Sequence, residues 1–219
     1  MELREILSRC DHTLLRVDAT AAEIRALCDQ GMRYGCASVC IPPCHVAGAK
    51  KYVGDRLRIG TVIGFPNGYD TTKAKCFEAA DAVENGADEV DMVACISAVK
   101  NGNWAYVKKD IKKVVAAAKG RPVKVILETS LLTRDELVKG CQCAKDAGAS
   151  FVKTSTGFFG GGATAEDVRL MKEAVKGACF VKASGGIKNG EQFKSMLDAG
   201  ADRVGTSSGV EIAKDLNGK

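Results

Sequence analysis

Two lysines stand at matching places in two apolar segments that have the pattern of β-strands. Lys153 lies in FVKTST, residues 151–156, and Lys182 lies in CFVKASGG, residues 179–186. Because side chains alternate between the two faces of a strand, each lysine shares a face with the phenylalanine two residues before it. Two close, buried ammonium groups disfavour each other's charge, so one of them is expected to be a neutral amine near neutral pH. Such an amine attacks carbonyl carbons, although the pattern does not show which lysine it is.

Two further strand-like segments place charges in the same way. In EVDMVA, Asp91 is in register with Val93, and in VKVILET, Lys124 is in register with Ile126. A single lysine of this kind is explained simply by a side chain that extends to solvent or neutralises a buried carboxylate. Three lysines and an aspartate on four consecutive strands are a costly way to stabilise a core, because buried ion pairs seldom repay their desolvation. We therefore interpret the set as functional, with Asp91 holding the remaining ammonium and relaying protons through a water molecule.

These segments belong to a repeat of helix, glycine, alanine and strand. The repeat is visible in NGADEVDMV (85–93), DAGASFVKT (146–154) and AGADRVGTS (199–207). The glycine suits the left-handed end of a helix, and the small alanine lets the chain turn back closely onto a sheet. Apolar strands that alternate with helices indicate a parallel sheet covered by those helices.

Eight such units are expected, and their helices have start signals of their own. Thr20 precedes Glu23, Thr133 precedes Glu136, and Thr164 precedes Asp167 by three residues, the spacing of a helix N-terminus. The expected strands are His12–Leu15, Ala37–Ile41, Arg58–Phe65, Glu89–Ala94, Val123–Thr129, Phe151–Thr156, Phe180–Gly185 and Arg203–Ser207. The sequence therefore predicts an α/β fold, a single (β/α)8 TIM barrel with parallel strands that forms one domain over residues 1–219.

A glycine-rich region at the end of the chain has the features of a phosphate site. Gly185 and Gly186 follow the seventh strand, and GTSSG, residues 205–209, closes the eighth and leads into a short helix. In these barrels, the seventh and eighth loops and a helix N-terminus meet an anion with backbone N–H groups and hydroxyls. We predict phosphate binding by Gly185, Gly186, Ser207 and Ser208, and by Gly157 after the sixth strand.

Composition excludes several other classes of protein. The formal charge of +5 comes from 32 basic and 27 acidic residues, without a run of Lys and Arg interleaved with aromatics, so a nucleic-acid partner is not expected. No window approaches eighteen uninterrupted apolar residues, and the charged start MELREILSRC does not resemble a secretory signal. We expect a cytoplasmic protein that has no membrane partner.

The ten cysteines favour reduced thiols over a disulfide framework. Cys36, Cys40, Cys44 and His45 superficially suggest a metal site, but their spacing matches no standard zinc pattern. Cysteines in the apolar segment ASVCI pack as small hydrophobic residues, so we expect no metal. The alternative is a metal-binding or redox protein centred on these cysteines.

Seven motifs together match a known family: DHTLL (11–15), ASVC (37–40), TVIGFP (61–66), ADEVDMV (87–93), FVKTSTGF (151–158), VKASGGI (181–187) and GTSSG (205–209). On these motifs, the chain resembles the deoxyribose-phosphate aldolases over essentially its whole length. The resemblance implies that Lys153 forms the Schiff base, that Lys182 is the second active-site lysine, and that Asp91 donates and accepts protons. It also places Asp11, Thr13 and Lys124 in the surrounding polar network.

The reaction that this resemblance implies is the reversible cleavage of 2-deoxy-D-ribose 5-phosphate to acetaldehyde and D-glyceraldehyde 3-phosphate, without metal or cofactor, in the breakdown of deoxyribonucleosides. The expected partners are small phosphorylated sugar and aldehyde substrates, and a homodimer or homotetramer is the expected assembly. The chain departs from the family pattern at Pro42-Pro43 and Cys95, which bears on aldehyde binding. The alternative within this chemistry is a transaldolase-like or other Schiff-base aldolase for a longer sugar phosphate.

Overall fold

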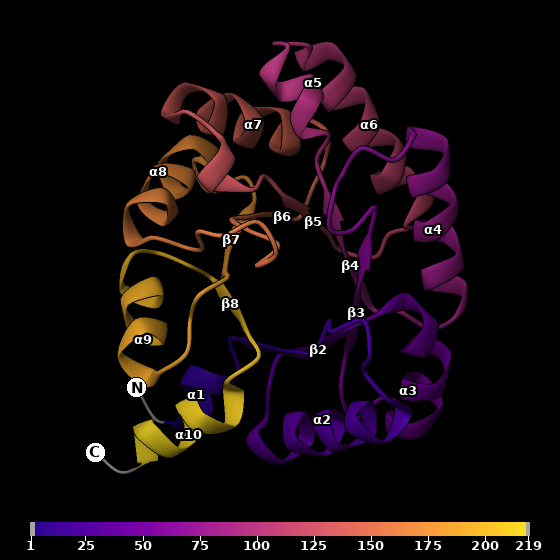
Figure 1. The fold of residues 1–219 in the computed structure, drawn as a ribbon, viewed down its shortest axis with the longest axis vertical. Helices are drawn as coiled ribbons and strands as arrows, with labels where there is room; N and C mark the ends of the chain where they lie inside the picture. Colours follow the sequence, from indigo (N-terminus) through magenta and orange to yellow (C-terminus); the bar gives the residue numbers. More distant parts are fainter. Residues whose placement is uncertain (1–2, 218–219) are drawn as a thin grey trace.

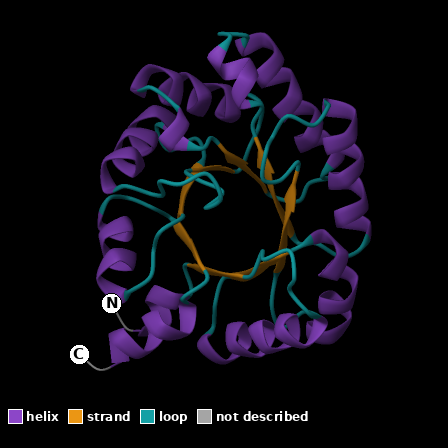
Figure 2. Ribbon diagram, viewed as in Figure 1, coloured by secondary structure: helices purple, strands orange, loops and turns teal. Residues whose placement is uncertain are grey.

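The computed structural model describes residues 3–217, which form one closed barrel of parallel strands. The strands pair in sequence order, and β1 pairs with β8 to close the ring. Viewed down the barrel axis, the strands form an inner ring that the helices surround (Figures 1 and 2). The predicted (β/α)8 fold is therefore confirmed.

The strands are β1 (Cys10–Thr13), β2 (Ser38–Ile41), β3 (Ile59–Ile63), β4 (Glu89–Val93), β5 (Val123–Ile126), β6 (Phe151–Lys153), β7 (Phe180–Ser184) and β8 (Arg203–Thr206). The helices are α1 (Leu3–Leu7), α2 (Ala21–Tyr34), α3 (Val46–Val53), α4 (Thr72–Glu84), α5 (Ile96–Lys100), α6 (Trp104–Ala117), α7 (Arg134–Asp146), α8 (Ala165–Val175), α9 (Gly190–Asp198) and α10 (Gly209–Asn217). Two 3₁₀ turns, η1 (Pro43–His45) and η2 (Thr129–Leu131), follow β2 and β5. None of the helices described is both long and apolar enough to cross a bilayer.

The first strand begins and ends two residues earlier than the predicted segment His12–Leu15. Pairing with β2 and β8 sets its limits, with Asp11 opposite both Ser38 and Gly205. The apolar Leu14 and Leu15 that suggested a strand lie beyond its end and line a cavity instead. The first strand is therefore shifted from its predicted segment but shares His12 and Thr13 with it, and the seven other strands lie within their predicted segments.

Helix signals in the sequence act as expected. Thr20 caps α2 by accepting a hydrogen bond from the Glu23 backbone N–H, and the Glu23 carboxylate accepts one from the Thr20 backbone N–H. At the other end of α2, Gly35 has φ 66°, and its N–H bonds to carbonyls of the last turn. This left-handed residue stops the helix and turns the chain into β2.

The hydrophobic core lies between the strands and the helices, while charged residues occupy the inside of the barrel. On β4, Val90 and Met92 belong to this core and are fully buried. Asp91, between them, faces the other way and contacts Lys182 on β7. Because β4 and β7 are not neighbours in the sheet, this contact passes through the barrel interior.

Candidate active site

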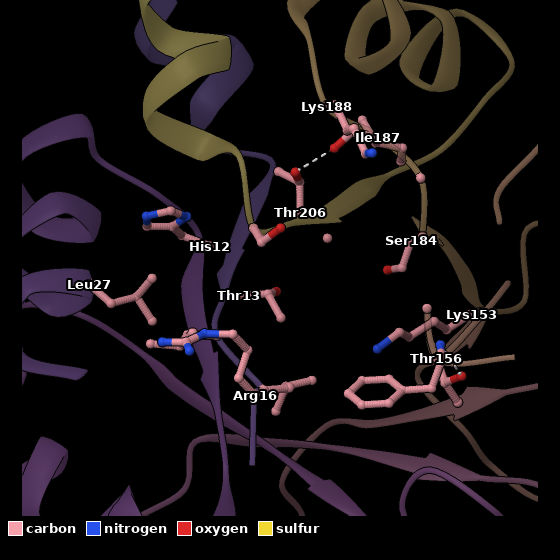
Figure 3. A pocket seen from close by; sticks show the side chains of 18 of the residues that line it. His12, Thr13, Arg16, Leu27, Lys153, Thr156, Ser184, Ile187, Lys188 and Thr206 are labelled. Atoms are coloured by element: carbon pink, nitrogen blue, oxygen red, sulfur yellow. Dashed lines mark hydrogen bonds between the residues drawn. The ribbon is translucent and has the colours of Figure 1, made fainter. Parts of the chain in front are cut away.

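Lys153, at the end of β6, lies at the base of a cavity of about 600 Å³. The residue is only 3% exposed. Figure 3 shows its amino group directed into the cavity, with Ser184 from β7 and Thr13 from β1 nearby. The loops after β7 and β8 supply Gly185, Gly186 and Ser207 to the same wall.

Lys182 stands beside Lys153 on the next strand and is its direct register partner. Both amino groups donate to one acceptor, Oδ2 of Asp91, at 2.8 Å. Lys124, which is the register partner of Asp91 on β5, donates to Oδ1 of that carboxylate, also at 2.8 Å. One aspartate therefore holds all three lysines that the strand pattern singled out.

A second carboxylate, Asp11, completes the cluster from β1. It forms an ion pair with Lys182 and accepts a hydrogen bond from Arg203 Nη1 at 2.5 Å. Glu89 links the far side of the cluster, with contacts of 3.2 Å to Lys124 and 3.3 Å to Arg203. The cluster comprises four basic groups, Lys124, Lys153, Lys182 and Arg203, and three carboxylates, Asp11, Glu89 and Asp91. Basic groups outnumber acidic ones, so the loss of one proton from a lysine would balance the buried charges.

Of the two neighbouring lysines, the electrostatics favour proton loss from Lys153. Burial lowers the pKa of Lys153, the charge of Asp91 raises it, the charge of Lys182 lowers it again, and the balance leaves it below its ordinary value. Burial also lowers the pKa of Lys182, but Asp11 and Asp91 outweigh this effect and hold it above its ordinary value. The two lysines that the sequence could not rank therefore differ in the direction of their pKa shifts.

Asp91 is held as a carboxylate. Burial raises its pKa, but the charges of Lys124, Lys153 and Lys182 more than compensate and leave that pKa well below its ordinary value. A base with these neighbours accepts a proton only when one of the lysines gives one up or when a reacting group supplies it. The arrangement can therefore support attack by a neutral amine beside a fixed cation and a proton acceptor.

The glycines that the sequence predicts to bind phosphate lie in loops that line the same cavity. Gly185 and Gly186 have φ angles of 93° and 76°, which turn the chain sharply after β7. They line the cavity together with Gly157 and Ser207. Ser208 does not line it; its backbone N–H donates to Thr206 Oγ1, directly before α10 begins. The structure thus brings together four of the five predicted phosphate-binding residues.

Comparison with known proteins is consistent with this geometry. The sequence model of the DeoC/LacD family aldolases matches residues 6–215. The chain belongs to this family. It is 53% identical to deoxyribose-phosphate aldolase 1 of Staphylococcus aureus, over 94% of each chain, and 53% identical to the deoxyribose-phosphate aldolase of a Thermoanaerobacter species, over 97% of each chain.

The similarity to known aldolases extends to three-dimensional structure. The deoxyribose phosphate aldolase from Aeropyrum pernix, described as having a unique tetrameric structure, superposes with a TM-score of 0.93 at 32% identity. The match covers 99% of this chain and 92% of that one.

Sequence reasoning missed Arg203 and Glu89 in the aldolase's buried cluster. Glu89 lies two residues before Asp91 on β4, so strand alternation could have placed it on the same face. Arg203 is the first residue of β8, two residues before Gly205. Thr13, which was predicted in the polar network, lines the cavity. Its hydroxyl donates to the backbone carbonyl of Asp11, so Thr13 lies beside the ionic cluster but makes no bond to its charged groups.

Glu128, which strand alternation places in register with Lys124 and Ile126, is a further buried residue that was not among the predicted site residues. It lies after β5 with φ 55°, a left-handed conformation that is strained for a residue with a side chain. Its Oε2 accepts hydrogen bonds from the backbone N–H and the hydroxyl of Thr156, at 3.0 and 2.5 Å. Thr156 lines the cavity, so Glu128 fixes the chain directly after Lys153.

The fold does not group Cys36, Cys40, Cys44 and His45 into a metal site within the described residues. Cys40 is buried on β2, where burial, aided by the charge of Asp91, raises its thiol pKa to about 11, whereas Cys44 is exposed. Within residues 3–217, no group of three or more His, Cys, Asp or Glu side chains is arranged to hold a metal ion. All ten cysteines are free thiols.

Proposed function

We propose that this aldolase reversibly cleaves 2-deoxy-D-ribose 5-phosphate to acetaldehyde and D-glyceraldehyde 3-phosphate. The observation that carries the proposal is the amine of Lys153, with its lowered pKa, at the base of a cavity whose other end is a glycine-rich loop pair. The names of the two relatives that are 53% identical support the same substrate.

Lys153 is the proposed nucleophile. Its neutral Nζ attacks C1 of the open-chain sugar, and loss of water from the resulting carbinolamine gives an iminium ion. This ion withdraws the electron pair of the C2–C3 bond when that bond breaks. The pair then lies in an enamine on C1 and C2, and C3 leaves as the aldehyde carbon of glyceraldehyde 3-phosphate. Protonation of C2 gives a second iminium ion, and addition of water to it releases acetaldehyde and restores the Lys153 amine. Since the iminium is itself the electron acceptor, the proposed reaction needs no metal or cofactor.

Asp91 and Lys182 have different proposed roles. The cleavage requires that a proton leave the C3 hydroxyl and that another reach C2 of the enamine, and we assign both transfers to Asp91, acting through a water molecule. Lys182 remains an ammonium ion, which keeps the pKa of Lys153 low. Lys124 and Asp11 hold Asp91 and Lys182 in place through the contacts described above.

The loops after β6, β7 and β8 are the proposed phosphate site. Backbone N–H groups of Gly157, Gly185 and Gly186 and the hydroxyl of Ser207 would meet the 5-phosphate. Ser208 would contribute from the N-terminal end of α10 rather than from the cavity wall.

A comparison of aldehyde donors tests the proposal. Purified protein is incubated with glyceraldehyde 3-phosphate and either acetaldehyde or dihydroxyacetone, and the product sugar phosphates are separated by mass. The proposal predicts 2-deoxyribose 5-phosphate from acetaldehyde and little product from dihydroxyacetone. Preferred use of dihydroxyacetone would assign the protein to an aldolase for longer sugar phosphates.

We also propose assembly as a homodimer or homotetramer, which is supported by the tetramer described for the Aeropyrum pernix relative. Light scattering of the purified protein during size-exclusion chromatography measures the mass directly. A mass equal to that of one 23.1 kDa chain would contradict the proposal.

A further inference from the structure

Most hydroxyl groups that line the cavity are already committed as hydrogen-bond donors within the protein. Thr13 Oγ1 donates to the Asp11 carbonyl at 2.9 Å, Thr156 Oγ1 to Glu128, and Thr206 Oγ1 to the Ile187 carbonyl at 2.6 Å. Each of these hydroxyls could donate to a substrate only if its present bond were broken, although it could still accept a hydrogen bond.

Ser184 is different. Its Oγ is buried and has no hydrogen-bond partner within residues 3–217, although the residue lines the cavity and is 6% exposed. A buried hydroxyl without a partner is costly, and in a ligand cavity it indicates a partner on the ligand. Figure 3 shows the Ser184 side chain directed into the open space above Lys153.

Two hydrogen bonds to Thr154 hold the backbone of Ser184. Its N–H donates to Thr154 Oγ1, and its carbonyl accepts from the same hydroxyl, both at 2.9 Å. The side chain takes no part in either bond. The Ser184 backbone is therefore anchored to Thr154, directly after β6, while its hydroxyl takes no part in that anchoring.

The neighbouring strand leaves room for this hydroxyl. Gly205 is the register partner of Ser184, and a Cβ at that position would lie 2.5 Å from Ser184 Oγ and 3.0 Å from Lys182 Cε. Any side chain at residue 205 would displace the hydroxyl or the lysine. The glycine therefore preserves a polar site between the two strands.

The order of residues along β7 indicates which part of a substrate lies there. Lys182 adjoins the reacting amine, Ser184 follows on the same face, and Gly185 and Gly186 come next in the proposed phosphate loop. A sugar phosphate with C1 at Lys153 and its 5-phosphate at Gly185 and Gly186 brings its C4 hydroxyl to Ser184. We propose that Ser184 binds this hydroxyl and makes the enzyme selective for aldehydes with a hydroxyl on the carbon next to the carbonyl. This inference rests on the proposed function.

The experiment compares two acceptors in the addition direction, with acetaldehyde as the donor. Glyceraldehyde 3-phosphate carries the C2 hydroxyl that becomes the C4 hydroxyl of the product, and 3-oxopropyl phosphate lacks it. The wild type should prefer glyceraldehyde 3-phosphate in kcat/KM, and Ser184→Ala should reduce this preference about tenfold, as expected for one lost hydrogen bond. Both acceptors are measured on one preparation, so the ratio does not depend on the folded fraction.

Ser155→Ala is the matched control. Ser155 Oγ is also buried and finds no hydrogen-bond partner in the described part of the chain, but Ser155 does not line the cavity. The control should keep the wild-type preference. An unchanged preference in Ser184→Ala, or an equal loss in Ser155→Ala, would overturn the assignment of Ser184. Absence of wild-type turnover with both acceptors would overturn the proposed function itself, and this inference with it.

Discussion

Lys153 and Lys182 are register partners on neighbouring strands, and their amino groups share a single acceptor, Oδ2 of Asp91, at 2.8 Å. The same environment shifts their pKa values in opposite directions, because Asp11 pairs with Lys182 and not with Lys153. This asymmetry provides a physical reason for one lysine to react while the other remains charged.

Removal of the Lys182 charge should make the Lys153 amine more basic. In Lys182→Met the like charge is lost, and Asp91 then acts more strongly on Lys153, so both effects raise the pKa of Lys153. The pH profile for reductive trapping of the Schiff base should shift upward by about one unit or more. Lys182→Arg keeps the charge and should show little shift. Coincident profiles for the wild type and Lys182→Met would contradict this role of Lys182.

Replacement of Asp91 should reduce turnover but still allow the Schiff base to form at Lys153. Asp91→Asn removes a proton acceptor, so kcat should fall at least about a hundredfold. It also removes the negative charge that raises the pKa of Lys153, so more of this lysine is neutral and borohydride trapping with substrate should persist. Steady-state kinetics and trapping are measured on a variant whose thermal unfolding is still cooperative. Loss of the unfolding transition would instead favour a structural role for Asp91.

The phosphate loop can be tested at Gly186. Its φ of 76° is strained for valine, so Gly186→Val should distort the loop and weaken phosphate binding. The preference for 2-deoxyribose 5-phosphate over unphosphorylated 2-deoxyribose should fall about ten- to a hundredfold in kcat/KM. Gly177→Val imposes the same strain, with φ 77°, at a site that does not line the cavity. Equal preferences in the two variants would contradict the assignment of Gly186 to the phosphate site.

A buried ion pair outside the active site should contribute to stability. Lys75 and Asp110 lie 2.9 Å apart between α4 and α6 and are at most 1% exposed, and Lys75 Nζ also donates to the Val93 carbonyl at the end of β4. Lys75→Met leaves the Asp110 charge without its cation and should lower the free energy of unfolding by about 3–5 kcal/mol. Lys108→Met breaks the half-exposed pair with Asp146 and should cost less than about 1 kcal/mol. Equal losses in chemical denaturation would show that burial of the first pair has no special effect.

Local patterns in the sequence predicted most of the fold. The capping residues Thr20 and Thr133 and the glycine after α2 act on neighbouring residues only, so their effects can be read along the chain. The position of β1 depends on pairing with β2 and β8, which are distant in sequence, and the apolar Leu14 and Leu15 suggested a later strand.

The candidate site was predictable where strand alternation applied. It placed Asp91, Lys124, Lys153 and Lys182 on inward faces, and these residues meet in the barrel. The asymmetry between the two lysines depends on Asp11, whose position across the closed barrel is a tertiary property. Ser184 was not recognised for the same reason, because its importance depends on having no partner in the folded protein.

The most direct test of the central claim is reductive trapping with 2-deoxyribose 5-phosphate. The wild-type protein is treated with substrate and sodium borohydride, digested, and mapped by mass spectrometry. The lowered pKa of Lys153 and its place at the base of the cavity predict an adduct on the peptide that contains Lys153, with Lys182 unmodified. An adduct on Lys182 would contradict the assignment of nucleophile and cation.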